Sequence, residues 1–149
     1  MIRAFRRADL DQVADLWLAV NLQTHAFVAP EYWKSNQGLV KELLPRAEVY
    51  VYEKDGEILG FVGLDGEYIE GIFVFPQMQS HGIGKSLVDF LKTKKAGLRL
   101  NVYQKNTRAI RFYEREGFQI RDEGLDEATG EKDYVMVWHQ INMNGGSRK

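Results

Sequence analysis

The sequence contains no cysteine among its 149 residues. This absence excludes disulfide bonds, thiolate metal ligands and a cysteine nucleophile together. The three histidines are scattered along the chain without a metal-binding spacing, so we expect no metal. No apolar run approaches the roughly 18–20 residues that a membrane span requires, and charges interrupt residues 1–20. We therefore expect no membrane partner and no secretory signal peptide, and we expect a cytoplasmic location.

A large excess of one charge sign is also missing. The chain carries 20 Lys and Arg against 21 Asp and Glu, and its net charge is −1. A dedicated nucleic-acid-binding domain is typically basic, so we expect no nucleic-acid partner. The 44% of hydrophobic residues and the chain length are typical of one globular domain. We predict a domain over residues 1–140 and a flexible polar tail over residues 141–149, in a monomer or a homodimer.

Local patterns in the first half predict a strand, two helices and then three strands. Apolar residues recur at helical spacing after Asp9, and Pro30 suits the first turn of a second helix. The period then changes to two, with hairpin signals at Asp55-Gly56 and Asp65-Gly66. The expected elements are a strand at 1–5, helices at about 9–20 and 30–45, and antiparallel strands at 49–54, 58–64 and 68–75.

The second half predicts a helix, a strand, a helix and two strands. Asn106 is a suitable cap for the second of these helices, and Gly117 is suited to end it. The expected elements are helices at 82–93 and 106–116 and strands at 98–102, 118–125 and 134–139. The helix at 82–93 would join the strands on either side of it into a parallel, right-handed βαβ unit. The fold class is α/β, with a mixed, mostly antiparallel sheet flanked by helices.

A glycine-containing turn, Gln79-Ser80-His81-Gly82-Ile83-Gly84-Lys85, joins an expected strand to an expected helix. A helix start exposes unpaired N–H groups and a positive dipole end, and glycine lets a phosphate come close. The turn lacks the third glycine of the dinucleotide pattern and does not match the P-loop, so a nucleotide-binding protein is the weaker interpretation. By itself, the turn fits a simple connection between strand and helix equally well.

Two motifs together resemble the GNAT family of acetyltransferases. Gln79, Gly82 and Gly84 match the family's pyrophosphate-loop pattern Q/R-x-x-G-x-G/A. The residues that match a second pattern, N-x-x-A-x-x-F/L-Y-x-x-x-G-F, are Asn106, Ala109, Phe112, Tyr113, Gly117 and Phe118. The similarity covers about residues 1–140, and the chain looks like small bacterial members, some of which act on protein lysines. The resemblance implies a GNAT fold whose βαβ unit binds acetyl-CoA, and direct acetyl transfer to an amine in a ternary complex.

The resemblance also implies which residues would bind acetyl-CoA. Ile72–Val74 would offer backbone groups to the pantetheine arm and an amide to the thioester oxygen. The strand at 68–75 would splay from its neighbour there, with Gly71 as a candidate β-bulge residue. The glycine turn would hold the pyrophosphate, and Asn106 would contact the cofactor besides capping its helix. The candidate cofactor-binding residues are Ile72, Phe73, Val74, Gln79, His81, Gly82, Ile83, Gly84, Lys85, Ser86 and Asn106.

Acetyl transfer from a thioester to an amine needs a neutral amine and a proton for the departing thiolate. The family pattern implies that Tyr113 is the general acid, and a tyrosine at this position also suits a packed helix. Some family members carry a glutamate base where this chain has Asn101, and an amide cannot act as a base. Glu70, expected on the same strand face as Tyr68 and Ile72, is the best remaining carboxylate. A water chain, or an amine that arrives neutral from solvent, would make Glu70 dispensable.

The acceptor is an amine whose identity the sequence leaves open. A protein lysine, a protein N-terminus and a small-molecule amine all fit the chemistry. By resemblance, the candidates that border the acceptor groove are His25, Phe27, Tyr32 and Tyr68, each of which also suits ordinary packing. The alternative function is a module of the same fold that binds acyl-CoA or a metabolite without turnover, and Tyr113 favours the enzyme.

Overall fold

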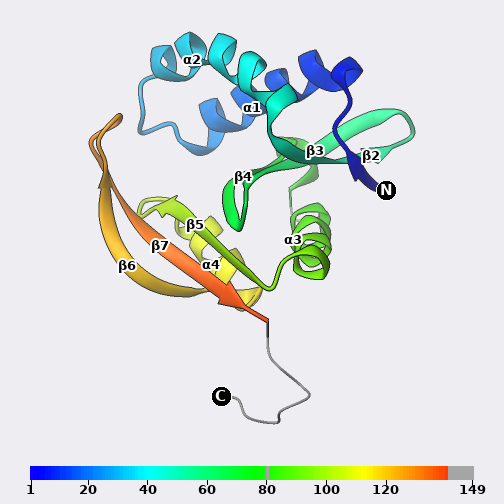
Figure 1. The fold of residues 1–149 in the computed structure, drawn as a ribbon. Helices are drawn as coiled ribbons and strands as arrows, with labels where there is room; N and C mark the ends of the chain where they lie inside the picture. The colour runs from blue at the N-terminus through cyan, green and yellow to red at the C-terminus, as the bar shows by residue number, and fades with distance from the viewer. Residues whose placement is uncertain (80, 141–149) are drawn as a thin grey trace.

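A computed structural model describes residues 1–79 and 81–140, which form seven strands and four α-helices (Figure 1). The strands are β1 (Ile2–Ala4), β2 (Glu48–Lys54), β3 (Glu57–Asp65), β4 (Tyr68–Val74), β5 (Gly97–Tyr103), β6 (Gln119–Asp126) and β7 (Glu131–His139). The helices are α1 (Leu10–Thr24), α2 (Pro30–Leu43), α3 (Ile83–Lys94) and α4 (Thr107–Arg115). Short 3-10 turns lie at Arg7–Asp9, Leu44–Arg46 and Pro76–Met78. The expected tail, residues 141–149, lies outside the described residues.

All seven strands belong to one sheet with the order β1-β2-β3-β4-β5-β7-β6. Neighbouring strands are antiparallel except β4 and β5, which are parallel and joined through α3. Asp55 and Gly56 have positive φ angles of 53° and 81°, and Gly66 has a φ of 62°, so both expected hairpin turns are present. The expected mixed, mostly antiparallel sheet with its parallel βαβ connection is confirmed.

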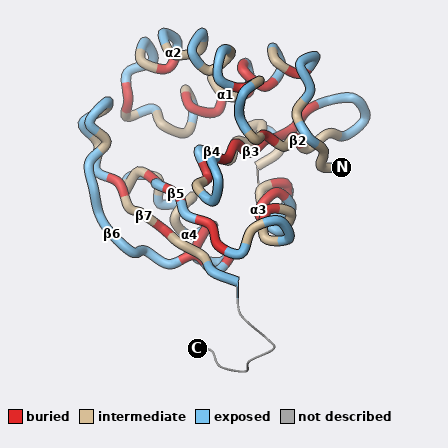
Figure 2. Tube along the Cα trace, viewed as in Figure 1, coloured by how far each residue is buried: buried red, intermediate tan, exposed pale blue. Residues whose placement is uncertain are grey.

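Two hydrophobic cores lie on opposite faces of this sheet. Val49, Val51 and Phe61 pack with apolar residues of α1. Alternate residues of β3, such as Val62, point to the other face and pack with Leu87 and its neighbours on α3. Figure 2 shows these buried segments in red, and it shows β6 exposed along nearly its whole length. The buried faces hold the central strands in place, while β6 forms an exposed edge of the sheet.

Short-range contacts fix both ends of α4. The side chain of Asn106 accepts a hydrogen bond from the backbone N–H of Ala109 at 3.2 Å, which satisfies a donor that the first helical turn leaves unpaired. Gly117 follows the helix with a φ of 95°, a conformation that glycine adopts without strain. Ala109 and Tyr113 of α4 then pack in the hydrophobic core that includes Leu87 of α3. The expected cap and stop of this helix are therefore confirmed.

β4 and β5 separate soon after they meet. Their parallel pairing consists of Tyr68 with Arg99 and Ile69 with Leu100, and the two strands then diverge (Figure 1). Beyond Ile69, the described residues of β4 keep a partner strand only on the β3 side. The expected splay between these strands is confirmed, and it leaves backbone N–H and C=O groups of β4 free for a ligand.

A β-bulge in β4 lies directly beside the splay. In the pairing with β3, Gly63 faces Gly71 and Leu64 faces Ile69, so Glu70 is the extra residue. Packing also favours glycine at position 71, because a Cβ there would lie 2.4 Å from an atom of the Phe73 ring, which would have to move. The bulge was predicted at Gly71, whereas the unpaired residue in the structure is its neighbour Glu70.

The bulge reverses the alternation of faces along β4. Ile69 and Ile72 both pack with the hydrophobic core that includes Leu87 of α3, although their positions differ by three and strict alternation would place them on opposite faces. Glu70 lies on the opposite face, since a Cβ at Gly63 would have Glu70 and Val49 as its neighbours. The expectation that Glu70 shares a face with Ile72 is therefore wrong, because strict alternation does not continue through a bulge.

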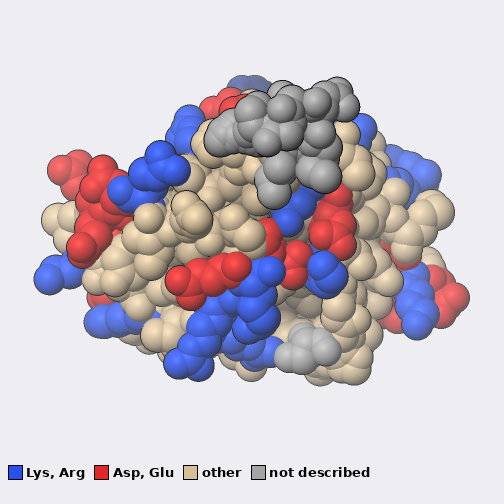
Figure 3. Space-filling view, turned by 90° about the horizontal axis from the view of Figure 1, so that it is seen from below, with Lys and Arg blue, Asp and Glu red and all other residues tan. Residues whose placement is uncertain are grey.

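The surface carries both signs of charge. On the face seen in Figure 3, Lys and Arg side chains lie beside Asp and Glu side chains in several places. None of the helices in the described part of the chain is long and apolar enough to cross a membrane.

Candidate active site

Two cavities meet beside the diverging ends of β4 and β5. One has a volume of about 340 Å³ and the other about 280 Å³. The residues that line both are Val20, Thr24, Ile72, Asn106, Ala109 and Tyr113. The charged residues that line the larger cavity are Lys85, Arg108, Arg115 and Glu116, and those that line the smaller one are Glu70, Asp126 and Asp133. We call them the basic cavity and the acidic cavity.

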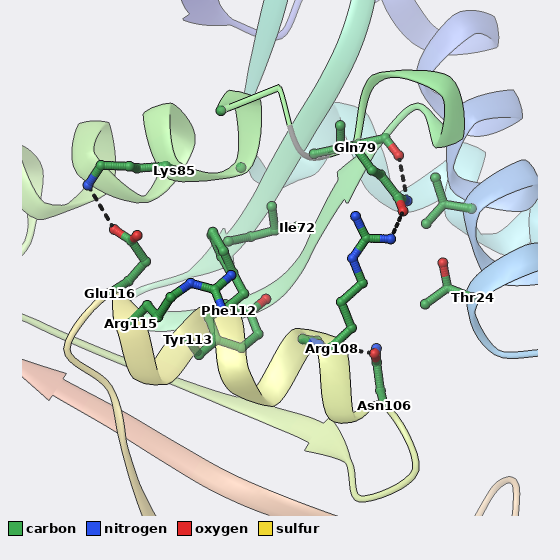
Figure 4. Close-up of a pocket in the computed structure, with 15 residues that line it drawn as sticks. Thr24, Ile72, Gln79, Lys85, Asn106, Arg108, Phe112, Tyr113, Arg115 and Glu116 are labelled. Atoms are coloured by element: carbon green, nitrogen blue, oxygen red, sulfur yellow. Dashed lines mark hydrogen bonds and ion pairs between the residues drawn. The ribbon is translucent and has the colours of Figure 1, made fainter.

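The basic cavity contains the start of α3 (Figure 4). Gly82 occupies the N-cap position with a φ of 83°, and no side chain of the described residues caps this helix. The N–H groups of the first turn can therefore bind an anion. A Cβ at Gly84 would lie 3.3 Å from the Phe112 ring, so packing also favours glycine at this position. The turn thus has both a structural and a ligand-binding reason for its glycines.

Basic side chains surround this helix start (Figure 4). Lys85 forms an ion pair with Glu116 at 3.3 Å, and Arg108 donates a hydrogen bond to Oε1 of Gln79 at 3.2 Å. Arg115 lines the same cavity. Arg108 and Arg115 were not among the residues predicted from the sequence to bind the cofactor. Their spacing of seven residues places both on one face of a helix, and this is the signal that could have found them.

Most of the residues predicted to bind the cofactor line the basic cavity; they are Ile72, Val74, Gln79, Gly82, Gly84, Lys85 and Asn106. The other four predicted residues do not. Ile83 is buried in the core, and His81 and Ser86 are exposed outside the lining. Phe73 stacks on Phe61 with ring centroids 4.8 Å apart and lines the acidic cavity instead.

Tyr113 lies where the two cavities meet and is 8% exposed. Its ring contacts those of Phe112 and Phe118, at centroid distances of 5.2 and 5.4 Å, so it is also a packed core residue. Burial raises the pKa of its hydroxyl above the ordinary value of 10. The hydroxyl therefore stays protonated at neutral pH, as a proton donor must.

Glu70 lines the acidic cavity at the bulge. Partial burial, and then the charge of Asp65, raise the pKa of its carboxyl above the ordinary glutamate value. Asn101 lines the same cavity, accepts a hydrogen bond from the Tyr68 hydroxyl at 2.9 Å and donates one to Asp133 at 3.3 Å. These two bonds fix the orientation of the Asn101 amide, which cannot act as a base, and Glu70 stays the predicted base.

Of the four residues predicted to border the acceptor groove, His25 lines the acidic cavity, and burial lowers the pKa of its imidazole to about 4. The other three make packing contacts or hydrogen bonds outside the lining. Phe27 packs edge-on against His25 at 5.7 Å, Tyr32 packs against Trp33 at 4.8 Å, and Tyr68 is held by Asn101. The lining residues that the sequence analysis missed are Trp17, Trp33, Tyr103, Asp126 and Asp133.

Comparison with protein families gives a direct match. The family model described as the acetyltransferase (GNAT) domain matches residues 45–120. The chain is 36% identical over 140 residues to the peptidyl-lysine N-acetyltransferase YiaC of Escherichia coli (strain K12), with 93% of this chain and 96% of that protein covered. It is 34% identical over 120 residues to the peptidyl-lysine N-acetyltransferase YjaB of Salmonella typhimurium, with 80% and 83% covered.

Solved structures show the same fold. The solution structure of apo-form YjaB from Escherichia coli matches with a TM-score of 0.83 at 24% identity, covering 95% of this chain and 98% of that one. The PaiA N-acetyltransferase from Thermoplasma acidophilum, solved in complex with coenzyme A, matches with a TM-score of 0.78 at 19% identity, covering 93% and 98%. The two sequence motifs, the family model and the similar relatives agree. The chain belongs to the GNAT family and is an acetyl-CoA-dependent N-acetyltransferase.

Proposed function

We propose that the chain acetylates the side-chain amine of protein lysines, with acetyl-CoA in the basic cavity and the lysine in the acidic cavity. The opposite charges of two cavities that meet at Tyr113 carry this proposal. The phosphates of acetyl-CoA are anionic, whereas a lysine with an ordinary pKa of about 10.4 arrives as an ammonium. The names of YiaC and YjaB as peptidyl-lysine N-acetyltransferases support the same acceptor class.

The basic cavity suits the phosphates and the arm of acetyl-CoA. The start of α3, which no side chain of the described residues caps, faces the pyrophosphate, with Arg108 and Arg115 as additional cations. The edge of β4 at Ile72–Val74, which pairs with no strand of the described residues other than β3, offers backbone groups to the amides of the pantetheine arm. The Val74 carbonyl on this edge already accepts a hydrogen bond from the Gln79 side chain at 3.2 Å. The thioester then lies near Tyr113, at the wall that the two cavities share.

The transfer requires one acid and one base. The amine nitrogen forms a bond to the carbonyl carbon, and the carbon–sulfur bond breaks. Tyr113 donates its hydroxyl proton to the departing sulfur, and burial suits this role because it keeps the hydroxyl protonated. Glu70 accepts the first proton from the lysine ammonium, directly or through a water, and its raised pKa makes it the stronger base. The second proton, which the nitrogen loses as the amide forms, returns to the phenolate of Tyr113. The cytoplasmic location and the oligomeric state stay predictions.

Two matched peptides test the acceptor class. One carries a single lysine and a blocked N-terminus, and the other carries a free N-terminus and no lysine. Incubation with acetyl-CoA, followed by mass spectrometry, should show an added acetyl group on the first peptide. Acetylation confined to the second peptide would contradict a lysine acceptor and assign the protein to N-terminal amines.

A further inference from the structure

Two buried side-chain atoms in the described part of the chain have no hydrogen-bond partner: Nε1 of Trp33 and Oδ1 of Asp133. Buried polar atoms are nearly always paired, because an unpaired one loses its hydration without compensation. Both residues line the acidic cavity. One atom is a donor and the other an acceptor, so a ligand that carries one group of each kind would satisfy both.

Asp133 is a buried carboxylate without a cationic partner. It is 8% exposed, and its Oδ2 accepts a hydrogen bond from the side-chain amide of Asn101 at 3.3 Å. Within residues 1–79 and 81–140, no Lys, Arg or His side chain forms an ion pair with it. A buried carboxylate is costly without a counter-charge. The cavity is therefore suited to a cationic ligand group.

Trp33 has its ring held by other aromatic side chains. Its indole is 7% exposed and packs against Trp17, His25 and Tyr32, at centroid distances of 5.8, 5.6 and 4.8 Å. This packing prevents the ring from turning toward a different hydrogen-bond acceptor. Aromatic walls also suit the apolar stem of a lysine and interact favourably with a cation at its end.

We propose that Asp133 receives the ammonium of the acceptor lysine and that the indole N–H of Trp33 donates to a carbonyl oxygen of the same peptide. The inference rests on the proposed function, since it names the residues that hold that lysine before transfer. Asp133 favours the ammonium form, so it binds the acceptor and does not replace Glu70 as the base. A metal ion is the poorer occupant, because no group of three His, Asp or Glu side chains in the described residues could hold one.

The substitution Asp133→Asn removes the charge and keeps the shape. Loss of a charge-assisted hydrogen bond should raise KM for a lysine peptide by about 10- to 100-fold, while kcat stays within a few-fold. The acetylated lysine side chain is neutral, so the inhibition constant of the acetylated peptide as a product inhibitor should change little in Asp133→Asn. Asp122→Asn, which removes an exposed carboxylate of β6 outside both cavities, is the matched control and should leave KM unchanged.

A second variant moves the carboxylate without changing it. A Cβ at Gly124 would lie 2.9 Å from Oδ1 of Asp133, so Gly124→Ala should displace the carboxylate and raise KM in the same direction. Trp33→Phe removes the N–H and should weaken the lysine peptide and the acetylated peptide alike, because both keep their carbonyl groups. Trp138→Phe on β7, outside both cavities, controls for the loss of an indole.

A binding measurement distinguishes a failure of this inference from a failure of the proposed function. Calorimetric titration of the lysine peptide into the CoA complex needs no turnover. Asp133-dependent binding without acetyl transfer would refute the proposed reaction and retain the ammonium site. An unchanged KM and an unchanged affinity in Asp133→Asn would overturn the inference. Equal weakening of the lysine peptide and its acetylated form in Asp133→Asn would overturn it as well, because Asp133 would then only shape the cavity.

Discussion

The side-chain amide of Asn106 lies 3.3 Å from Nε2 of His25 and links the start of α4 to the end of α1. Asn21 donates to the backbone carbonyl of Trp17, so its Oδ1 faces Nδ1 of His25 at 2.8 Å, and this nitrogen carries the hydrogen. Nε2 is then free to accept from Asn106, whose own Oδ1 is taken by the N–H of Ala109. A neutral imidazole thus joins two walls of the acidic cavity.

The neutral state of His25 predicts a specific sensitivity to acid. Burial lowers its pKa from 6.5 to about 4, so between these values the unfolded chain binds a proton that the folded chain does not. The free energy of unfolding should therefore fall as the pH drops through this window, by at most about 3 kcal/mol for this residue. Urea unfolding at several pH values should show a weaker pH dependence in His25→Gln. Identical pH dependence in both proteins would contradict the assignment.

Tyr113 is expected to act through its hydroxyl. Tyr113→Phe keeps the ring and its contacts with Phe112 and Phe118, and removes only the proton donor. Turnover should fall by about 10²- to 10⁴-fold while CoA affinity barely changes. Steady-state kinetics and a thermal-shift titration with CoA measure the two effects separately. Turnover within a few-fold of wild type would make Tyr113 a packing residue alone.

The start of α3 predicts how CoA binding responds to charge. Gly84→Asp places a carboxylate beside the helix start that faces the phosphates, so CoA affinity should fall by about tenfold or more. Gly84→Ala is the control for packing, since its Cβ also meets the Phe112 ring at 3.3 Å but adds no charge. The wild type should gain about 2.7 kcal/mol of stability at a hundredfold excess of CoA over its dissociation constant. A folded Gly84→Asp variant with unchanged affinity would exclude this pyrophosphate site.

The role of Glu70 as the base predicts an acid limb in the pH profile of the acetylation rate, where protonation of its carboxyl lowers the rate. Because partial burial and the charge of Asp65 raise its pKa, this limb should lie above the ordinary glutamate value of 4.5. Glu70→Gln should lower the rate by about tenfold or more and remove the limb. Asp65→Asn should keep the rate and move the limb to lower pH. A Glu70→Gln variant with the wild-type rate and profile would show instead that the amine arrives neutral from solvent.

The elements were predictable because local signals define them. Asp55-Gly56 and Gly66 adopt the expected positive φ angles, and Asn106 and Gly117 set the ends of α4 as their residue types suggest. The bulge at Glu70 was not predictable in the same way. The residues around it read as one continuous strand, and the extra residue is defined only by the register with β3.

The lining of the acidic cavity could not be predicted from local sequence patterns. Trp17 and Trp33 come from two helices, Tyr103 from β5 and Asp133 from β7, and no local pattern relates them. Each looks like a core aromatic or a strand carboxylate by itself. Only the tertiary arrangement brings them to one wall, whereas the basic cavity is built around two contiguous motifs that the sequence displays.

The most direct measurement compares the acetyl-lysine formed with the CoA released by the purified protein, acetyl-CoA and the N-terminally blocked lysine peptide. We predict one acetyl-lysine for each CoA released, at a rate that Tyr113→Phe reduces by about 10²- to 10⁴-fold. CoA binding without any acetyl-lysine would contradict the account, and would instead support a module that binds acyl-CoA without turnover.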